Sequence, residues 1–408
     1  MSERRPGCAA VPRRPGEAPC RSRAQGGVVA RRVRLRRARR SAERVRRRTW
    51  RRCRRASTRR DPWRARQANE RCSKEKPVMK VGLYLTTQFT KEQSVAASRG
   101  DMLEQVRVAR QSGFRSLWVP HHYATEPMQM LAPTPMLAYL LREAEGMMIG
   151  PNILIMPLLN PVHVAEDAVT LDLLSGGNYC LGIGIGYREA EFVAFNVPLK
   201  ERVGRITESI EIMRKLWTQD RVTYKGKYFS IDDMGVGLKP LRKGGPPIWL
   251  AAVVDPAVKR AAEIGDAWLI TNFAHLKELV PQMQLYRETL QAAGKPFPDD
   301  APITRECYVG PTNAKALEEC KAALQYKYAA YSSWGLDSQS KGAESFQQPF
   351  EDFVKDRFII GDKAFVKDEI QRYNGLLGVN HFIMRVQWPS LPHEKVLRSI
   401  SSLGEIFA

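Results

Sequence analysis

The sequence has no long apolar run and few cysteines. Its most apolar region, 131–174, is interrupted by Arg142, Glu143 and Glu145, so no stretch reaches the roughly 18 apolar residues of a membrane-spanning helix. Its 7 cysteines form no CxxC pair and no Cys/His spacing suited to zinc. We therefore expect no membrane span, no metal site and no disulfide framework, and a cytoplasmic protein with reduced cysteines.

A charge excess is missing from most of the chain. Residues 1–77 hold 28 Lys and Arg against 6 Asp and Glu, whereas residues 78–408 hold 37 of each. A neutral body offers no electrostatic footprint for nucleic acid or for an anionic membrane surface. Binding of either kind would have to reside in the basic segment.

The basic segment, 1–78, contains too few apolar residues to form a core and repels itself, so it is predicted to be disordered. A nucleic-acid-binding arm and a transit peptide are two interpretations of it. We favour a third, that it is not part of the functional protein, because GC-rich DNA translated out of frame yields this Arg, Ala, Pro and Gly content. The functional chain, 79–408, would then begin at Met79, directly before the first strand-like run.

From Met79 onward, short apolar or β-branched runs alternate with longer segments of helical period, which is the pattern of βαβ units. Helices are expected at 102–111, 164–173 and 206–217. Eight such repeats in about 300 residues are most economically a closed α/β (β/α)8 barrel, the TIM barrel fold. The strands are expected at 81–86, 116–120, 148–156, 179–184, 248–251, 267–271, 303–309 and 381–386.

Two segments do not follow this alternation. Residues 221–245 are predicted to form a hairpin or an irregular excursion, and residues 331–360 show little periodicity. Insertions of such length in a barrel are usually lids or irregular surface. We expect the second one after the seventh strand, where Tyr331, Trp334 and Phe346 would form an aromatic wall over a substrate.

Polar residues that follow barrel strands are the candidates for chemistry, because the carboxyl ends of the strands carry the active site in this fold. His121 and His122 directly follow the second strand; as neighbours they are expected to point two ways, so that at most one faces the site. A structural role at the strand end stays open for them. The remaining histidines are expected to be structural or on the surface: His163, His275, His381 and His393.

Glycines alternate at the end of the fourth strand, at Gly182, Gly184 and Gly186. A glycine in a strand marks a place where another backbone or a ligand comes close, and a flat cofactor is one such ligand. The pattern is not the dinucleotide-binding fingerprint, because no GxGxxG opens a helix after a first strand.

In chain order, these residues resemble the bacterial luciferase-like flavin-dependent oxidoreductases. The resemblance covers the chain from Met79 to the C terminus. It implies a (β/α)8 barrel, usually a homodimer, that binds reduced FMN or the deazaflavin F420 at the carboxyl ends of the strands. It rests on Trp118 with His121-His122, Gly150 to Pro157, Asn160-Pro161, Ala165 to Asp167, Leu171 to Gly177, Gly182 to Gly186, Glu191-Phe192, Pro246 to Trp249, Arg260 to Ala262 and Gly265 to Trp268.

The family's catalytic histidine falls on His121, with His122 beside it. Luciferases place a carboxylate before that histidine, where this chain has Pro120. The family's non-prolyl cis peptide, which supports the flavin ring from behind, falls between Asn152 and Ile153. Candidate hydrogen-bond donors in the pocket are Tyr84, Tyr123 and Tyr187.

The flavin phosphate would lie at 185–187 and at the turn after the fifth strand, where relatives commonly carry Gly-Gly and a hydroxyl residue. Here that turn reads Ala251-Ala252-Val253-Val254-Asp255. The amides of Val253 and Val254 would still bind a phosphate, although Asp255 would weaken the binding. Two roles are equally compatible with the sequence for a further set of charged residues: they bind a ligand, or they form ion pairs along a helix face. These residues are Glu191, Arg202, Arg205 and Glu208. The expected cofactor contacts are Tyr84, Asn152, Ile153, Ile185, Gly186, Tyr187, Val253 and Val254.

The resemblance implies a monooxygenase in which reduced FMN and O2 form a C4a-hydroperoxyflavin that oxidises a small organic substrate. His121 would be the general acid and base, since a histidine pKa of about 6.5 suits neutral pH. One alternative is F420-dependent hydride transfer, although F420 sugar-phosphate dehydrogenases carry Glu and Asn where this chain has Tyr187 and Ala190. Another is flavin binding without turnover. A separate flavin reductase is an expected partner, because no NAD-binding segment is present.

Overall fold

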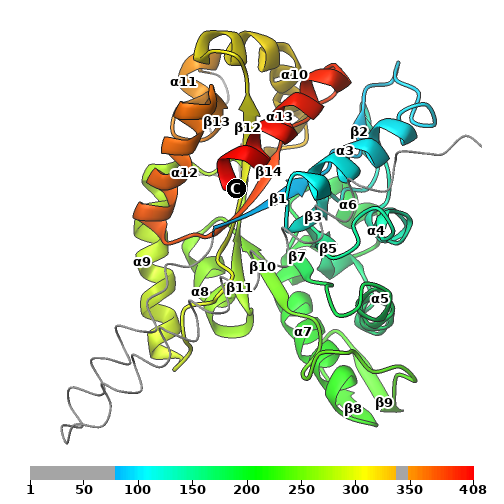
Figure 1. Ribbon diagram of the computed structural model, residues 1–408. Helices are drawn as coiled ribbons and strands as arrows, with labels where there is room; N and C mark the ends of the chain where they lie inside the picture. Colours follow the sequence, from blue (N-terminus) through cyan, green and yellow to red (C-terminus); the bar gives the residue numbers. More distant parts are fainter. Residues whose placement is uncertain (1–78, 337–347) are drawn as a thin grey trace, which may run out of the picture. The chain divides into compact units, whose positions relative to one another are not determined.

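The computed structural model describes residues 79–336 and 348–408. The predictions for the basic segment 1–78 and for Phe346 therefore lie outside the described residues. Nine strands form a nearly closed parallel barrel surrounded by helices (Figure 1), in the order β5-β3-β1-β14-β12-β11-β10-β7-β6. A bridge between Ile149 and Tyr179 spans the remaining gap. The strands are β1 (Lys80–Tyr84), β3 (Ser116–Val119), β5 (Met148–Pro151), β6 (Leu154–Ile155), β7 (Leu181–Gly184), β10 (Ile248–Ala252), β11 (Ala267–Ile270), β12 (Pro302–Val309) and β14 (His381–Arg385).

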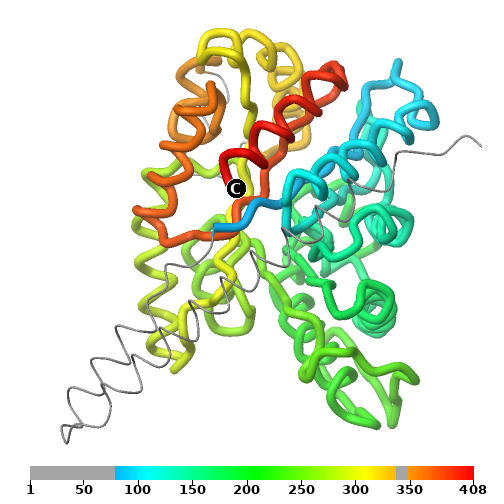
Figure 2. Tube along the Cα trace, viewed as in Figure 1, coloured from blue at the N-terminus to red at the C-terminus, as the bar shows by residue number. Residues whose placement is uncertain are grey.

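All eight predicted strands are present, which confirms the predicted (β/α)8 barrel. The third predicted strand, 148–156, is divided into β5 and β6 because residues 152 and 153 leave the ladder, so the barrel has nine strands. The first strand of the chain pairs with the last, and Figure 2 shows these blue and red segments side by side.

Helices follow the strands and cover the outside of the barrel (Figure 1). Helix α5 shows how the sequence sets a boundary: the Asn160 side chain accepts a hydrogen bond from the Val162 N–H, and Pro161 occupies the first helical position. The helices are α3 (Arg99–Gln111), α4 (Pro133–Leu140), α5 (Pro161–Leu174), α6 (Glu189–Ala194), α7 (Arg202–Thr218), α8 (Asp255–Ile264), α9 (Leu276–Ala292), α10 (Asn313–Ser333), α11 (Phe350–Val354), α12 (Lys363–Leu377) and α13 (His393–Phe407).

The barrel strands are buried on both faces, and alternate residues enter two different cores. In β3, Leu117 and Val119 pack toward the helices, whereas Trp118 packs inside the barrel. Trp118 stacks there on Trp249, with 4.8 Å between ring centroids. Burial on both faces explains why the strands are nearly continuous apolar runs in the sequence.

A polar chain lies inside the barrel beside these tryptophans. The Nε2 atom of His381 lies 2.7 Å from the Ser116 Oγ atom, and its Nδ1 atom lies 3.2 Å from Asp300. The same Ser116 oxygen accepts the indole N–H of Trp118 at 2.7 Å. Every member has a partner within the barrel, so His381 is structural, as predicted from the sequence.

The two irregular segments differ from each other. The first contains an antiparallel hairpin, β8 (Val222–Lys225) and β9 (Ser230–Met234), beside α7, which confirms the predicted hairpin. The prediction of little periodicity from residue 331 is wrong at its start, because Tyr331 lies in the last turn of α10. The described remainder holds α11 and β13 (Ile359–Gly361), a tenth strand that pairs with β12. A short pair, β2 (Gln88–Phe89) and β4 (Gln129–Met130), lies outside the barrel sheet.

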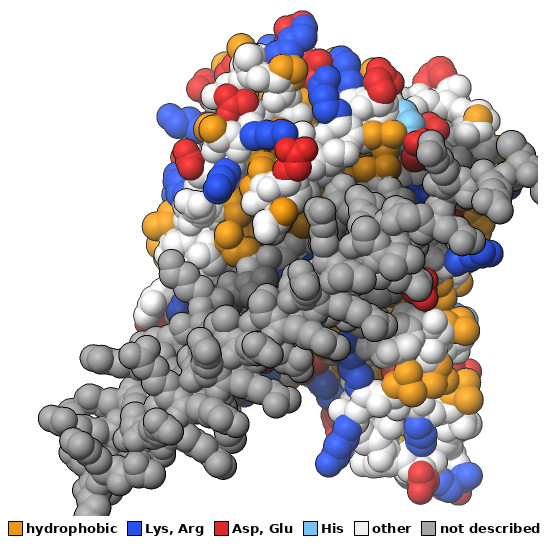
Figure 3. Space-filling view, viewed as in Figure 1, with side chains coloured by type: hydrophobic (Ala, Val, Ile, Leu, Met, Phe, Trp, Pro, Cys, Tyr) orange, Lys and Arg blue, Asp and Glu red, His pale blue; other side chains and the backbone are white. Residues whose placement is uncertain are grey.

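On the face shown in Figure 3, acidic and basic side chains are interspersed over the described surface, as expected for a body with balanced charge. Among the described helices, none combines the length and the apolar character needed to cross a bilayer. The three cysteines of the described chain, Cys180, Cys307 and Cys320, are free and buried.

Candidate active site

A cavity of about 430 Å³ lies at the carboxyl ends of the barrel strands. Most of its walls come from residues that end or follow β1, β3, β5, β7, β10, β11 and β14, and from the last turn of α10. The cavity brings together all ten residues predicted from the sequence: Tyr84, His121, His122, Asn152, Ile153, Ile185, Gly186, Tyr187, Val253 and Val254.

Two details of the sequence prediction are wrong here. Both His121 and His122 line the cavity, because β3 ends at Val119 and the residues beyond it no longer alternate between two faces. Tyr123 is not among the lining residues. Its ring packs instead against His121 and Phe195, each with 4.4 Å between ring centroids.

The peptide bond between Asn152 and Ile153 is cis, which confirms the expectation for this position. The hydroxyl of Tyr84 donates a hydrogen bond to the Asn152 carbonyl oxygen at 3.1 Å. The Asn152 side-chain amide donates to the Thr304 Oγ atom at 2.7 Å. Strands β1 and β12 therefore hold the Asn152–Ile153 segment, which we call the cis bulge, and both of its residues face the cavity.

His121 is a neutral imidazole in this structure. Burial, assisted by the charge of His122, lowers the pKa of His121 to about 4. Its Nδ1 atom accepts the Ile155 N–H at 3.2 Å, so the hydrogen is on Nε2. The ordinary histidine pKa assumed from the sequence does not apply. His121 can donate a hydrogen bond to a ligand, but it is not an imidazolium at neutral pH.

His122 has the carboxylate partner that the sequence lacks at position 120. Its Nδ1 atom lies 3.1 Å from Oε1 of Glu191, a fully buried residue of α6. The same oxygen accepts the Tyr123 N–H at 2.8 Å and lies 3.4 Å from Arg188. Burial alone would raise the pKa of Glu191, but His122, the Tyr123 N–H and Arg188 hold it below its ordinary value. The ionised carboxylate therefore orients the His122 ring.

The predicted phosphate region lies at one end of the cavity. Helix α8 begins at Asp255, with Val254 as its N-cap. Pro256 has no N–H and the Ala257 N–H donates to the Val254 carbonyl at 2.8 Å, so the amides that would meet an anion are those of Val253 and Val254, just before the helix. Asp255 accepts a hydrogen bond from Gln282 at 3.1 Å. Arg202 also lines the cavity, and it donates to the Gly186 carbonyl at 3.1 Å. Arg202 brings a positive charge that offsets Asp255.

The alternating glycines have two different causes. A Cβ on Gly182 would lie 2.2 Å from the Pro151 carbonyl oxygen, so neighbouring backbone excludes any side chain there. Gly184 and Gly186 line the cavity, where Cβ atoms would lie 2.9 Å and 2.6 Å from Ile153 and Ile155 side chains. Gly186 also has φ of 70°, a conformation that favours glycine.

Aromatic rings cover the cavity near His122. Tyr331 lines the cavity and stacks on Trp334, with 5.2 Å between ring centroids. The His122 ring lies 5.9 Å from Tyr331 and 5.4 Å from Trp334, and the Arg188 guanidinium lies 4.2 Å above the Trp334 ring. These rings form the described part of the predicted aromatic wall.

Comparison with known proteins agrees with this architecture. Residues 79–380 match the family described as luciferase-like monooxygenase. The chain belongs to this family. Its members are oxidoreductases, and its relatives include both FMN-containing and F420-dependent enzymes.

Three relatives show the range of the luciferase-like family. The F420-dependent glucose-6-phosphate dehydrogenase of Amycolatopsis mediterranei is 26% identical over 74% of this chain and 92% of that protein. The alkanal monooxygenase alpha chain of Photorhabdus luminescens is 22% identical over 68% and 78%. The uncharacterized protein y4vJ of Sinorhizobium fredii is 26% identical over 57% of this chain and 66% of that protein.

Solved structures share the fold. The monooxygenase RslO1 from Streptomyces bottropensis has a TM-score of 0.70 at 20% identity, covering 80% of this chain and 98% of that one. The oxygenating constituent of 3,6-diketocamphane monooxygenase from Pseudomonas putida, in complex with FMN, has a TM-score of 0.65 at 18% identity, covering 81% and 98%.

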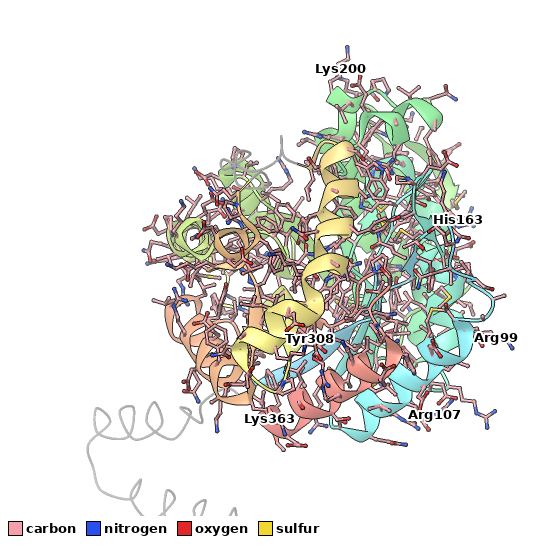
Figure 4. All side chains as sticks on the ribbon, turned by 90° about the horizontal axis from the view of Figure 1, so that it is seen from above. Arg99, Arg107, His163, Lys200, Tyr308 and Lys363 are labelled. Carbon is pink, nitrogen blue, oxygen red and sulfur yellow. The ribbon has the colours of Figure 1, made fainter. Side chains whose placement is uncertain are left out.

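Other residues singled out in the sequence are structural. Arg205 donates to the Pro157 carbonyl at 2.9 Å, and Glu208 accepts three backbone N–H groups of the β8–β9 hairpin, from Lys227, Tyr228 and Phe229. His163 lies on the outside of the molecule (Figure 4) and pairs with Asp167 at 3.5 Å. His275 caps α9, and His393 lies 3.0 Å from Glu104.

Sequence reasoning missed several residues that line the cavity. Arg385 ends the apolar strand β14, and Thr304 lies within β12. Thr271 and Asn272 follow β11. One signal was available for Arg385, because an arginine within the run Phe-Ile-Met-Arg-Val is unusual for a strand buried on both faces.

Proposed function

We propose that this protein is a flavin-dependent monooxygenase that uses reduced FMN and O2 to oxidise a small organic substrate. One observation carries the proposal: in a luciferase-like barrel, the Asn152–Ile153 cis bulge and both histidines face the same cavity. The Ile155 N–H bond to His121 joins the bulge to the histidine pair.

The residues of the cavity fit a flavin. Gly184 and Gly186 keep the wall beside the bulge free of side chains, so a flat ring has room against Ile153. The amides of Val253 and Val254, which directly precede α8, and the Arg202 guanidinium would hold the phosphate. When bound, reduced FMN would supply the electrons and the reaction with O2.

The chain's own groups then have separate tasks. Neutral His121 donates a hydrogen bond from Nε2, while His122, oriented by Glu191, takes and returns a proton through its Nε2 atom. The rings of Tyr331 and Trp334 keep water from the cavity. Because water is excluded, the reactive product of the reaction with O2 does not decay before it meets the substrate. The expected homodimer and the separate flavin reductase stay predictions.

A second candidate is hydride transfer with F420. It is supported by the similarity to an F420-dependent dehydrogenase along 92% of that enzyme's length. Against it stands Tyr187, which occupies the place of the glutamate that F420 sugar-phosphate dehydrogenases carry. Tyr187 faces the cavity, and its ring lies 5.8 Å from that of His122.

Binding of the two cofactors distinguishes the candidates. The full chain is titrated without oxygen with reduced FMN and, separately, with reduced F420, and each complex is then mixed with air. We expect tighter binding of FMN and reoxidation of the bound flavin at a rate different from that of free flavin. Preference for F420, with no oxygen consumption, would replace the monooxygenase by the dehydrogenase.

A further inference from the structure

Four ionisable side chains lie fully buried beside the cavity. Arg305 and Glu306 are neighbours in β12, Lys327 lies in α10, and Arg385 ends β14. We call them the buried ionic cluster. Each of the four side chains is 0% exposed, although a charge in a protein interior is costly unless it is paired.

Glu306 is the carboxylate of this cluster, and it is saturated with donors. It accepts hydrogen bonds from Lys327 Nζ, the Trp388 indole and the Asn272 amide. It also accepts the Tyr328 hydroxyl at 3.2 Å. Burial would raise the pKa of Glu306, but Lys327 and Arg385 hold it below its ordinary value, so the carboxylate is ionised.

Arg385 is the member of the cluster that lines the cavity. Its Nη2 atom donates to Gln88 at 2.5 Å, and its Nε atom lies 3.2 Å from the Thr86 hydroxyl and 4.0 Å from Glu306. Its guanidinium lies 5.1 Å above the Tyr84 ring. The Nη1 atom is buried and has no hydrogen-bond partner among the described residues.

The positive charges of this cluster exceed the negative ones. Among the described residues, Glu306 is the carboxylate that favours the charged forms of Lys327 and Arg385, and it acts on Arg305 less than Tyr373 and Tyr328 do. Burial, reinforced by Arg385, lowers the pKa of Lys327 to about 7 despite Glu306. Even with Lys327 neutral, two buried guanidinium groups share one buried carboxylate: Arg385 lies 4.0 Å from Glu306, whereas Arg305 bonds the Thr271 carbonyl and lies over the Tyr373 ring. A ligand with a negative charge would balance this excess.

We infer that the cavity binds a substrate with an apolar body and an anionic oxygen group, a carboxylate in the first instance, which Arg385 attracts. This inference rests on the proposed function, because it assigns the substrate class of the same site. The walls suit such a molecule: Ile153, Ile155 and Leu336 are apolar, and Arg385 supplies the charge. The negatively charged N1–C2 carbonyl edge of a reduced flavin has the same chemistry and is the other source of an anionic oxygen.

Binding of matched probes tests the inference. The full chain is titrated by calorimetry, at fixed ionic strength, with benzoate and hexanoate and with their neutral isosteres benzamide and hexanamide. We expect at least one acid to bind about ten-fold more tightly than its amide, in keeping with a charge-assisted hydrogen bond. Equal affinities in both pairs, or no binding of either acid, would overturn the inference.

Three variants locate the effect. Arg385→Gln should abolish the preference for the acid, and Arg385→Lys, which keeps the charge beside Glu306, should retain most of it. Arg398→Gln changes the net charge equally at the surface, where Arg398 pairs with Glu319, and should leave the preference unchanged. A preference that survives in Arg385→Gln contradicts the inference.

Titration of the same variants with reduced FMN separates the two sources of anionic oxygen. If Arg385 serves the substrate, Arg385→Gln loses the benzoate preference and keeps its FMN affinity. If the variant loses FMN affinity and keeps the preference, Arg385 serves the cofactor and the inference is wrong. A wild-type protein that prefers benzoate but binds no FMN would refute the proposed function and leave the anionic site standing.

Discussion

The Nδ1 atom of His122 lies 3.1 Å from Oε1 of Glu191, although 69 residues separate the two along the chain. Glu191 reaches the histidine from α6, which follows β4, β5, β6 and β7 in the sequence. A carboxylate on Nδ1 fixes the tautomer of the ring and leaves Nε2 to exchange protons. Under the proposed function, proton transfer therefore falls to His122 and a fixed donor role to His121.

Replacing Glu191 by Gln tests this positioning role. The amide keeps the shape but removes the charge that orients His122, so proton transfer becomes slower. We expect the oxidation of bound reduced FMN by air to slow on the order of 10²-fold and its solvent isotope effect to rise. Glu191→Asp should restore part of the rate. Stopped-flow mixing in H2O and D2O measures both quantities.

Glu208→Gln is the matched control. Glu208 is also a carboxylate that accepts backbone N–H groups, but it holds the β8–β9 hairpin and does not line the cavity. We expect its replacement to leave the rate and the isotope effect unchanged. An equal fall in rate in both variants, without a change in isotope effect, would show that Glu191 is only structural.

The lowered pKa of His121 predicts a pH dependence of stability. In the unfolded chain the histidine has a pKa of about 6.5, whereas burial lowers it to about 4 in the fold. Between these values the unfolded state binds more protons. The free energy of unfolding is therefore full above pH 6.5 and falls by about 3 kcal/mol from this group as the pH drops to 4.

Urea unfolding of the wild type and His121→Asn at several pH values checks this dependence. Asn can still accept the Ile155 N–H but does not titrate. The difference between the two free energies of unfolding should change by about 3 kcal/mol between pH 6.5 and 4. His275, whose pKa is also lowered by burial to about 4, contributes to both proteins and cancels. A difference that is constant with pH would contradict the buried, neutral His121.

The barrel could be predicted from the sequence because its strands are buried on both faces and form apolar runs between helical segments. The ten predicted cavity residues could be placed because they follow strands, and parallel strands end at one edge. The helical start of the second irregular segment, at Tyr331, could not be predicted. Helix α10 buries Lys327, Tyr328 and Tyr331 beside Glu306 and Arg385, so no apolar stripe marks its last turns.

Polar contacts between residues far apart in the sequence could not be predicted either. The approach of Glu191 to His122 depends on how α6 returns over the barrel, which no local pattern records. The cluster of Arg305, Glu306, Lys327 and Arg385 is likewise assembled from three elements, 80 residues apart at the ends, as the positions in the chain show. Within one strand, each member is merely an ionisable residue in an apolar run.

Replacement by Ala should have opposite effects on the free energy of unfolding at Gly182 and at Gly100. A Cβ on Gly182 would lie 2.2 Å from the Pro151 carbonyl oxygen, whereas a Cβ on Gly100, in α3, would meet no described residue within 4 Å beyond its chain neighbours and the backbone of its own helix. Gly182→Ala should lower the free energy of unfolding by roughly 3 kcal/mol, since backbone must move. Gly100→Ala should raise it by roughly 0.5–1 kcal/mol through helix propensity. Urea unfolding of both variants measures the difference; similar values for the two would contradict the close approach of β7 and β5.

The buried ionic cluster predicts unequal effects of removing its opposite charges. Glu306→Gln leaves Lys327 and Arg385 without a carboxylate, and we expect it to lower the free energy of unfolding by about 3–5 kcal/mol. Lys327→Met removes one cation, but Glu306 keeps its hydrogen bonds to Trp388 and Asn272 and its pairing with Arg385, so the loss should not exceed about 2 kcal/mol. Because positive charge is in excess, removal of the carboxylate should destabilise the fold more than removal of one cation. Urea unfolding at pH 8 compares the two variants, and a larger loss in Lys327→Met would mean that the cluster is balanced and has no need of an anionic ligand.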